Sequence, residues 1–434
     1  MEKEPSMVNQ KVVITGMGVI SCYGHQLADF WQAISHGKNG IKQWSEVEGT
    51  EFPVQYASTV DVCDLLQAFP NWPVDTKPVE RRVLFGALAA QQALSDADIR
   101  CGEGIGVFSC SGVPEINDAE LSQVNRNGIH AFSKQTMAAG ANQFSALQSG
   151  NDNISVQIAH QSGATGPVVN INGACAGAAQ SIGAAFQAIR RGELQQALAG
   201  GADSVLNART MSGLFLLGAT ATANHRKNKL CCPFDAERGG LVAGEGGAYL
   251  VLESESSARA RGARIYAEVQ GYGSSMDAYK VTAPRPDGRG AQAAMVSALA
   301  DAGIKPDAID YINAHGTSTP LNDKIETAAI KTIFGYGSVS SKGENGSQLP
   351  LVSATKSMIG HWISAAAAPE AIATVLAIHH GLVPPTINLQ NSDPLCDLDY
   401  VPDIARPYSL THCLSNSFGF GGINSSLVFG KYNE

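Results

Sequence analysis

PVVNINGACAGAAQSIGAAFQAIRRG, residues 167–192, is the stretch of this chain that decides its fold. Its first residues form an apolar run that predicts a buried strand, and the alanine- and glycine-rich continuation predicts a helix of small residues. The same plan returns later, where LVSAT at 351–355 predicts a strand that leads into a second small-residue helix at 357–378. An apolar strand that runs twice into such a helix indicates two related α/β halves.

The remaining apolar runs complete these two halves. The division is expected near 255–262, which gives a first half at 8–258 and a second half at 259–434. The polar, irregular stretch at 113–165 is interpreted as a cap or an interface insertion in the first half. Further strands are predicted at 11–20, 104–110, 196–206, 247–253, 265–272, 309–314 and 425–430, and further helices at 27–35, 78–98 and 290–303.

The composition disfavours several classes of protein. Of the 434 residues, 44% are hydrophobic and 16% are charged, which suits a large core, and a net charge of −9 argues against broad nucleic-acid binding. The nine cysteines are scattered without a C-x-x-C pair, so free thiols are expected rather than disulfides or a zinc knuckle. The N-terminus, MEKEPSMVNQ, lacks the apolar core of a signal peptide, and no apolar run reaches the ~18 residues of a membrane span. A cytoplasmic protein is the simplest expectation.

Cys175 lies at the turn between the strand and the helix of the opening stretch. Its side chain would be held rigidly there and would face the positive end of the helix, which stabilises a thiolate and lowers the cysteine pKa from about 8.5. The glycines and alanines on both sides leave room for a substrate to reach the sulfur. Cys175 is therefore a candidate nucleophile, with a buried structural cysteine as the alternative.

Two histidines follow predicted strands of the second half. His315 lies in NAHGTSTP, after the strand at 309–314, and His361 lies in TKSMIGHW, after the strand at 351–355. Open α/β sheets place their sites at the carboxyl ends of strands, so a functional role for both residues stands beside the alternative of a place in the core or on the surface. No H-E-x-x-H or similar spacing occurs, so a metal site is the weaker interpretation.

NSFGFGGINSS, residues 416–426, predicts a glycine-rich loop whose backbone can approach a ligand closely. Its N–H groups could donate to a developing oxyanion, and its two phenylalanines could line a site or belong to the core. No lysine follows in the spacing of a phosphate-binding loop, so that alternative is weaker.

Eight motifs follow one another along the chain: VVITGMGVISCYG (12–24), NGACAGA (172–178), ALAGGADSV (197–205), PFDAERGGLVAGEGGAYLVLE (233–253), NAHGTSTPLND (313–323), SATKSMIGH (353–361), VPPTINL (383–389) and NSFGFGGINSSLVF (416–429). In this order they resemble the β-ketoacyl-ACP synthase family, of the elongating type called KAS I/II, over nearly the whole chain. The resemblance implies an α/β thiolase fold, which is a five-layered αβαβα sandwich of two similar halves. It also implies that the protein is usually a homodimer.

The resemblance implies roles for the residues singled out above. Cys175 would accept the acyl group, while His315 and His361 would drive the decarboxylation of malonyl-ACP. The N–H groups of Cys175 and Phe420 would form the oxyanion hole, and Phe420 would also gate the acyl pocket. Phe418 is expected with Phe420 at the oxyanion hole and gate.

Further residues are expected to support the two histidines. Lys356 would do so while tied to acidic partners that look like Asp323 and Glu326. Thr317 and Thr319, from the same motif as His315, are expected to assist them.

The implied reaction is a decarboxylative Claisen condensation of malonyl-ACP with an acyl group on Cys175. It needs no metal and no cofactor beyond the phosphopantetheine of the carrier protein. Three departures from the family's pattern leave the preferred acyl chain undetermined. The nucleophile motif reads A-C-A-G-A where the family commonly has A-C-[TS]-S-G, an arginine and a leucine usual after residue 211 are missing, and CSGVPEIN at 110–117 differs at the expected pocket floor. Fatty-acid elongation and a type II polyketide or aryl-polyene pathway are both open.

Acyl carrier proteins are acidic, so basic clusters are candidate docking sites, with a solvated surface as the alternative. The candidates are Lys77, Arg81 and Arg82 in one cluster, and Arg226, Lys227 and Lys229 in another.

A different function is also open, namely a non-catalytic partner subunit like a chain-length factor in a ketosynthase heterodimer. Such proteins lose the cysteine, which this chain keeps at Cys175. Thiolases pair their cysteine with a second cysteine, and initiating synthases use a Cys-His-Asn set, so both fit less well.

Overall fold

Ten strands form one mixed sheet within the described residues, in the order β10-β9-β13-β14-β8-β1-β7-β6-β4-β5. The structure is a computed structural model that describes residues 9–69, 80–100, 102–112, 150–335 and 349–433. The first half contributes β1 (Val12–Ile20), β4 (Gly106–Cys110), β5 (Val168–Ile171), β6 (Gln196–Asp203) and β7 (Gly246–Ser254). The second half contributes β8 (Ala267–Met276), β9 (Tyr311–Asn313), β10 (Leu351–Ser353), β13 (His412–Phe418) and β14 (Ile423–Gly430).

The two halves repeat the same strand order and the same strand directions. The antiparallel series β1, β7, β6 in the first half corresponds to β8, β14, β13 in the second. The parallel series β6, β4, β5 corresponds to β13, β9, β10. The halves join where residues 12–14 of β1 run antiparallel to β8. The chain therefore consists of two similar α/β halves, and the boundary at residue 258 stays a prediction.

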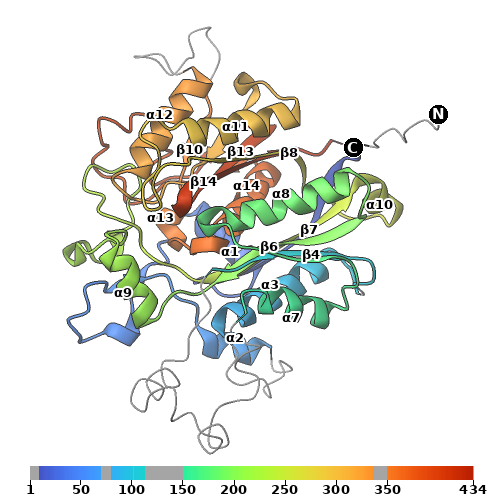
Figure 1. Ribbon diagram of the computed structural model, residues 1–434, viewed down its shortest axis with the longest axis horizontal. Coiled ribbons are helices and arrows are strands. Elements are labelled where there is room, and N and C mark those ends of the chain that lie inside the picture. The colour runs from blue at the N-terminus through green and yellow to red at the C-terminus, as the bar shows by residue number, and fades with distance from the viewer. Residues whose placement is uncertain (1–8, 70–79, 101, 113–149, 336–348, 434) are drawn as a thin grey trace, which may run out of the picture.

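Helices form the other three layers of a five-layered sandwich. α3 and α7 cover the outer face of the first half, and α11, with α12 packed beside it, covers that of the second. α8 and α14 lie between the halves and contact strands of both (Figure 1). This is the αβαβα arrangement that the sequence predicts. The helix bounds are α3 (Arg81–Asp96), α7 (Asn153–Ser162), α8 (Gly177–Arg190), α11 (Arg289–Ala302), α12 (Asn322–Phe334) and α14 (Ala367–His380).

Smaller elements complete the described chain. They include the short helices α1 (Leu27–Ser35), α2 (Val62–Ala68), α9 (Ala208–Leu216), α10 (Glu255–Ala260) and α13 (Lys356–Ile359). The connections contain the 3₁₀ segments η4 (Ala174–Ala176), η5 (Asn224–Lys229), η7 (Ile363–Ala365) and η8 (Phe420–Gly422). The two-residue strands are β2 (Lys42–Gln43), β3 (Tyr56–Ala57), β11 (Leu382–Val383) and β12 (Arg406–Pro407). Within the described ranges, no helix is long and apolar enough to cross a membrane.

The central helices are rich in alanine and glycine, which suits their packing against elements on several sides. A helix that is apolar all round is typical of a buried layer, and α14 is buried from Ala367 through Ile378. In α8, a Cβ added to Gly183 would lie 2.4 Å from the ring of Tyr272 on β8. A larger side chain at this position would push the two halves apart.

Two predicted elements are wrong in detail. The helix predicted at 357–378 is interrupted, because α13 ends at Ile359, Gly360 takes a φ of 68°, and α14 begins only at Ala367. The loop predicted at 416–426 is mostly strand, with only the turn η8 between β13 and β14. The break at Gly360 and the turn η8 both lie between apolar runs. The pattern of apolar residues predicts strands and helices but not the turns that interrupt them, so neither feature could be predicted from it.

Candidate active site

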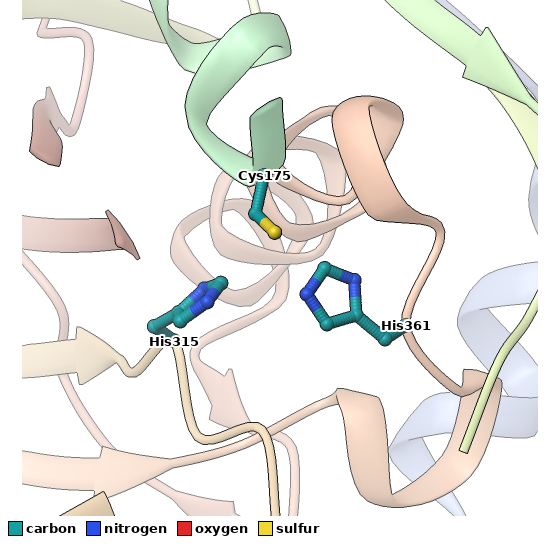
Figure 2. Close-up of side chains that lie close together, drawn as sticks. All are labelled: Cys175, His315 and His361. Atoms are coloured by element: carbon teal, nitrogen blue, oxygen red, sulfur yellow. The ribbon is translucent and has the colours of Figure 1, made fainter. Parts of the chain in front are cut away.

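Cys175 lies in η4, the short turn that connects β5 to α8. Ala174, just before it, has a φ of 45°, a left-handed conformation that costs energy and that surrounding contacts must hold. The turn places Cys175 at the N-terminal end of α8, where helix N–H groups are free to meet a negative charge. The side chain is buried, and in Figure 2 its sulfur points toward two imidazole rings.

The sulfur of Cys175 and one ring nitrogen each of His315 and His361 lie within 4.8 Å of one another. The two ring centroids are 5.4 Å apart and their planes are nearly perpendicular, at 88° (Figure 2). All three side chains are buried. The thiol comes from the first half and both imidazoles from the second, so the site forms only where the halves meet.

His315 follows β9, and contacts on both its backbone and its ring hold it in place. Glu326 of α12 accepts the N–H groups of His315 and Gly316, at 2.8 and 2.9 Å. The Nζ of Lys356 lies 3.2 Å from His315 Nδ1. Because an ammonium group can only donate, Nδ1 is the acceptor and the ring proton lies on Nε2.

His361 lies at the break between α13 and η7. Its backbone pairs with the segment at 242–244, where its N–H donates to Val242 O at 2.8 Å and its carbonyl accepts the Gly244 N–H at 2.9 Å. Its Nδ1 accepts the N–H of Ile363 at 3.0 Å. The proton of a neutral His361 ring therefore also lies on Nε2.

Burial lowers the pKa of both His315 and His361 well below the usual value, and the charge of Lys356 adds to this effect. The neighbouring ring of His361 lowers the pKa of His315 further. Both imidazoles are therefore neutral at physiological pH, and each presents an Nε2–H donor. This arrangement favours hydrogen bonding to a developing negative charge over coordination of a metal ion.

We expect both rings to stay neutral when free histidine would already be charged. Between pH 8 and about 5.5, the ¹⁵N NMR signals of His315 and His361 should keep the shifts of the Nε2–H tautomer, because their pKa lies below the reference value of about 6.5. Titration of either site ring with a midpoint at or above 6.5 would contradict the prediction.

The pKa of Cys175 does not follow the sequence-based expectation. Burial raises the pKa of the thiol, while the Phe420 N–H and the charge of Lys356 act against this rise. The expected lowering is therefore wrong as a net direction, because desolvation outweighs the donors around the sulfur. The Phe420 N–H does point at the sulfur from η8, as an oxyanion donor would.

Lys356 has a different acidic partner from those expected. Its Nζ forms a short ion pair with Glu370 of α14, and both side chains are 1% exposed. Burial raises the pKa of Glu370 to about 7, and Lys356 opposes this rise. Glu370 is not among the residues predicted from the sequence, although a single carboxylate within the apolar run of α14 is a visible signal.

The two acidic residues expected beside Lys356 have other partners. Asp323 accepts the N–H of Phe234 at 2.9 Å and lies 3.5 Å from Arg238, so it holds a neighbouring loop. Glu326 holds the backbone after β9, as described above. Pairing of Lys356 with Asp323 or Glu326 is therefore wrong, because α14 brings Glu370 closer to the ammonium group.

Most of the remaining expected residues lie next to the histidines. The ring of Phe418 meets that of His315 edge to face, with centroids 5.9 Å apart. The hydroxyl groups of Thr317 and Thr319 are 2.9 Å apart in the loop after His315. Phe420 is half-buried and, like Ile363, packs against a hydrophobic cluster that contains Leu206 and Leu241.

Gly419 allows the turn η8 to approach the nucleophile. A Cβ at this position would lie 2.9 Å from the backbone nitrogen of Cys175 and 3.3 Å from the Cβ of Ala174. The φ of Gly419 is −109°, which any residue can adopt, so only the close approach requires glycine.

Gly419→Ala should therefore lower the rate of acyl transfer to Cys175 about 10-fold or more, as expected when a reacting group moves by about 1 Å. The matched control is Gly239→Ala, because a Cβ at the exposed Gly239 meets nothing within 4 Å. Equal rates for the two variants in a single-turnover assay would show that the close approach has no role.

The structure changes the set of candidate docking residues. Arg82 is 1% exposed, and its guanidinium donates to Glu80, Ser111 and the Gly150 carbonyl, so its expected role on the docking surface is wrong. Its side chain is buried because these hydrogen bonds connect the start of α3 to Ser111, just after β4, and to Gly150, just before α7. Lys77 and the pocket-floor residues 113–117 lie outside the described residues.

The other basic residues differ in their exposure and in the ion pairs that they form within the chain. Arg81 forms an ion pair with the buried Glu245. Arg226 has a side chain that is 8% exposed and donates to Glu237 at 2.8 Å. Lys227 is exposed, as is Lys229 at the end of the same turn. These two lysines are the docking candidates that the structure leaves on the surface.

Comparison with known proteins agrees with this geometry. Two protein-family models match the chain, "Beta-ketoacyl synthase, N-terminal domain" over residues 9–258 and "Beta-ketoacyl synthase, C-terminal domain" over residues 266–390. It is 38% identical to 3-oxoacyl-[acyl-carrier-protein] synthase 2 of Synechocystis sp. and 37% identical to that of Coxiella burnetii, with 98% of this chain and 99% of each relative covered.

Similar solved structures include "The ishigamide ketosynthase/chain length factor", with a TM-score of 0.84 and 33% identity. They also include "AntDE:AntF (apo): type II PKS acyl-carrier protein in complex with its ketosynthase bound to the hexaketide", with a TM-score of 0.83 and 31% identity. Each covers 98% of this chain and 100% of the matched chain. With its thiolase fold and with both domains matched, this chain belongs to the β-ketoacyl synthase family.

Proposed function

We propose that this chain is a 3-oxoacyl-[acyl-carrier-protein] synthase, which joins malonyl-ACP to an acyl group on Cys175 by a decarboxylative Claisen condensation. The observation that carries the proposal is the convergence of one thiol and two neutral imidazoles within 4.8 Å. The names of the curated relatives support acyl carrier protein as the bearer of both substrates. These substrates arrive on its phosphopantetheine, and the proposed steps use no metal or further cofactor.

The first step moves the acyl chain from the carrier thiol to Cys175. The Cys175 sulfur attacks the thioester carbonyl, a tetrahedral intermediate forms, and the carrier thiol leaves with a proton. The N–H groups of Cys175 and Phe420 are the proposed oxyanion donors. Loss of one such donor costs about 3 kcal/mol, or roughly a hundredfold in rate.

The second step removes carbon dioxide from the malonyl thioester. The electron pair of the broken C–C bond becomes an enolate, whose oxygen accepts hydrogen bonds from Nε2–H of His315 and His361. Neutral rings can fill this role because the hydrogen bonds that each Nδ1 accepts leave the ring proton on Nε2, where it can be donated. Lys356 keeps the His315 proton on Nε2 by donating to Nδ1.

The third step forms the new carbon–carbon bond. The enolate carbon attacks the Cys175 thioester, and the second tetrahedral intermediate collapses to release the 3-oxoacyl product and the Cys175 sulfur. The same oxyanion donors serve both acyl transfers.

The proposal leaves two pathways for this reaction, fatty-acid elongation and type II polyketide or aryl-polyene synthesis. Relatives from both kinds of enzyme match the chain over nearly its full length. The alternative of a non-catalytic chain-length-factor-like subunit is weaker, because Cys175 and both histidines are present and converge.

We also propose a dimer, either of two copies or with a related subunit. Among the described strands, β5 ends the sheet order and pairs only with β4. Val168 on β5 is 44% exposed, and Val156 on the neighbouring helix α7 is 55% exposed. An edge strand with exposed apolar side chains on it and beside it favours pairing with a partner strand. A cytosolic location stays a prediction.

The test is to incubate the purified protein with acyl-ACP and malonyl-ACP and to follow the products by mass spectrometry. A 3-oxoacyl-ACP two carbons longer than the donor is expected, together with an acyl adduct on the peptide that contains Cys175. A panel of donors of different length and saturation would identify the pathway. Absence of both the product and the adduct with every donor would refute the proposal.

Lys227 and Lys229 offer a test of carrier docking. Their turn η5 leads directly to Cys231, whose thiol donates to the Lys356 carbonyl at 3.1 Å, so a carrier bound there would lie close to the site. Charge reversal of both lysines to glutamate should raise KM for malonyl-ACP about 10-fold at low salt and leave kcat unchanged. The same reversal at the exposed Lys11 and Lys431 is the control, and equal effects of the two pairs would remove the docking role.

A further inference from the structure

The turn after His361 contains a strained residue. Ile363 has a φ of 46°, which a β-branched residue adopts only under constraint. Its N–H donates to His361 Nδ1, and this contact sets the orientation and the tautomer of the ring. The position of His361 therefore depends on whatever holds the turn η7 in place.

The contacts that hold η7 come from the other half of the molecule. Asp203 is the last residue of β6, and its Oδ2 accepts the N–H of Ser364 at 3.0 Å. Its Oδ1 accepts the N–H of Ser204, also at 3.0 Å. Cys110, the last residue of β4, lies 3.1 Å from the Ser364 carbonyl and donates its thiol to it. Two strand ends of the first half thus hold both backbone groups of Ser364.

Asp203 is well suited to act as a fixed acceptor. It is fully buried, and a Cβ added to Gly112 would lie 2.5 Å from its Oδ2, so the carboxylate has little room to move. Burial raises its pKa to about 6, so it is ionised at neutral pH and gains a proton as the pH falls through that value. The ionisable groups that act on it are Arg82 of α3, Cys110 of β4, Cys175 of η4 and, through Ser204, Glu245.

We propose that Asp203 is a positioning residue for the decarboxylation step, which holds η7 so that His361 keeps its Nε2–H directed at the substrate. It acts through Ser364 and not on the reacting atoms. The inference rests on the proposed function, and it adds a carboxylate of the first half to a step whose donors both come from the second half.

Asp203→Asn is the informative substitution because it keeps the shape and removes one acceptor. Both neighbours of the carboxylate are N–H donors, so the amide group of asparagine must face one of them with its own NH₂. The kcat for decarboxylation of malonyl-ACP should fall about 10- to 100-fold with little change in KM. The rate at which iodoacetamide alkylates Cys175, followed by peptide mass spectrometry, should not fall, since the charge of Asp203 raises the pKa of this thiol and its removal favours the thiolate.

Glu253→Gln is the matched control. Glu253 is an equally buried carboxylate on β7, and it pairs with Gln196 at the opposite end of β6 from Asp203. This control should leave both rates near those of the wild type. Equal loss of decarboxylation in the two variants, or equal loss of both rates in Asp203→Asn, would reduce Asp203 to a structural role and overturn the inference.

The pH profile adds a second readout. In the wild type, decarboxylation should decline as the pH falls through about 7, where Glu370 takes up a proton, and further through about 6, where Asp203 does so. Asp203→Asn should keep the first decline and lack the second, and an acid limb identical to that of the wild type would overturn the inference. Absence of wild-type decarboxylation at every pH would instead refute the proposed function, which keeps the two failures distinct.

Discussion

Cys175→Ala is expected to abolish carbon–carbon bond formation, with a loss of at least about 10⁴-fold, because it removes the proposed acyl acceptor. The Cys175 sulfur lies within 4.8 Å of one ring nitrogen of each imidazole. The measurement is the rate of 3-oxoacyl-ACP formation by mass spectrometry. Cys63→Ala is the control, since Cys63 is an exposed thiol outside the site and should be dispensable.

Cys175→Gln separates the two halves of the chemistry. It should also abolish condensation, but decarboxylation of malonyl-ACP should persist or increase. The side-chain amide can offer its carbonyl oxygen to the N–H groups of Cys175 and Phe420, as the bound thioester would, while His315 and His361 are untouched. Elongation of acyl-ACP by either variant would show that the nucleophile lies elsewhere.

Glu370→Ala is expected to have the second largest effect, on both stability and activity. It would leave the ammonium group of Lys356 buried without its counter-ion, which costs about 3–5 kcal/mol in the free energy of unfolding. Without this ion pair, Lys356 would no longer be held against His315 Nδ1, so decarboxylation should fall as well. Urea denaturation and the decarboxylation assay measure the two effects.

A double variant distinguishes charge burial from catalysis. Lys356→Met combined with Glu370→Leu replaces the ion pair by apolar groups of similar size and should recover most of the lost stability. It should not recover decarboxylation, because His315 loses its donor. Asp397→Ala is the matched control, since its pair with Lys331 is exposed and worth less than about 1 kcal/mol. A fully stable and active Glu370→Ala would contradict the assigned role of this ion pair.

The central layers of the fold could be predicted because their signal is local. The small residues of α8 and α14 follow apolar strands, and this pattern predicts both the repeat and the layer in which the helices lie. The helix predicted at 27–35 agrees with α1, and the helix predicted at 290–303 is within one residue of α11. The break at Gly360 was missed because it depends on backbone pairing of His361 with residues 242–244, which are far away in sequence.

The site could be predicted only in part, for the same reason. Cys175, His315 and His361 each follow a strand, and the equal topology of the halves brings the strand ends together. The acidic partner of Lys356 could not be predicted from residues in the same motifs. Glu370 lies on α14, beyond the break at Gly360, and only the fold brings its carboxylate to the ammonium group. Arg82 looked like a surface residue because its sequence context is basic, while its burial depends on Ser111 and Gly150, which distant segments supply.

The origin of the catalytic groups in different halves has a consequence for the protein during its own synthesis. A chain still emerging from the ribosome already contains its nucleophile, but it lacks both imidazoles and the helix α14 against which α8 packs. Domains generally fold from the N-terminus as they are made, so for a time the thiol exists without the groups that would consume malonyl thioesters. By the proposed mechanism, a chain that ends before His315 lacks both imidazole donors and should not decarboxylate malonyl thioesters.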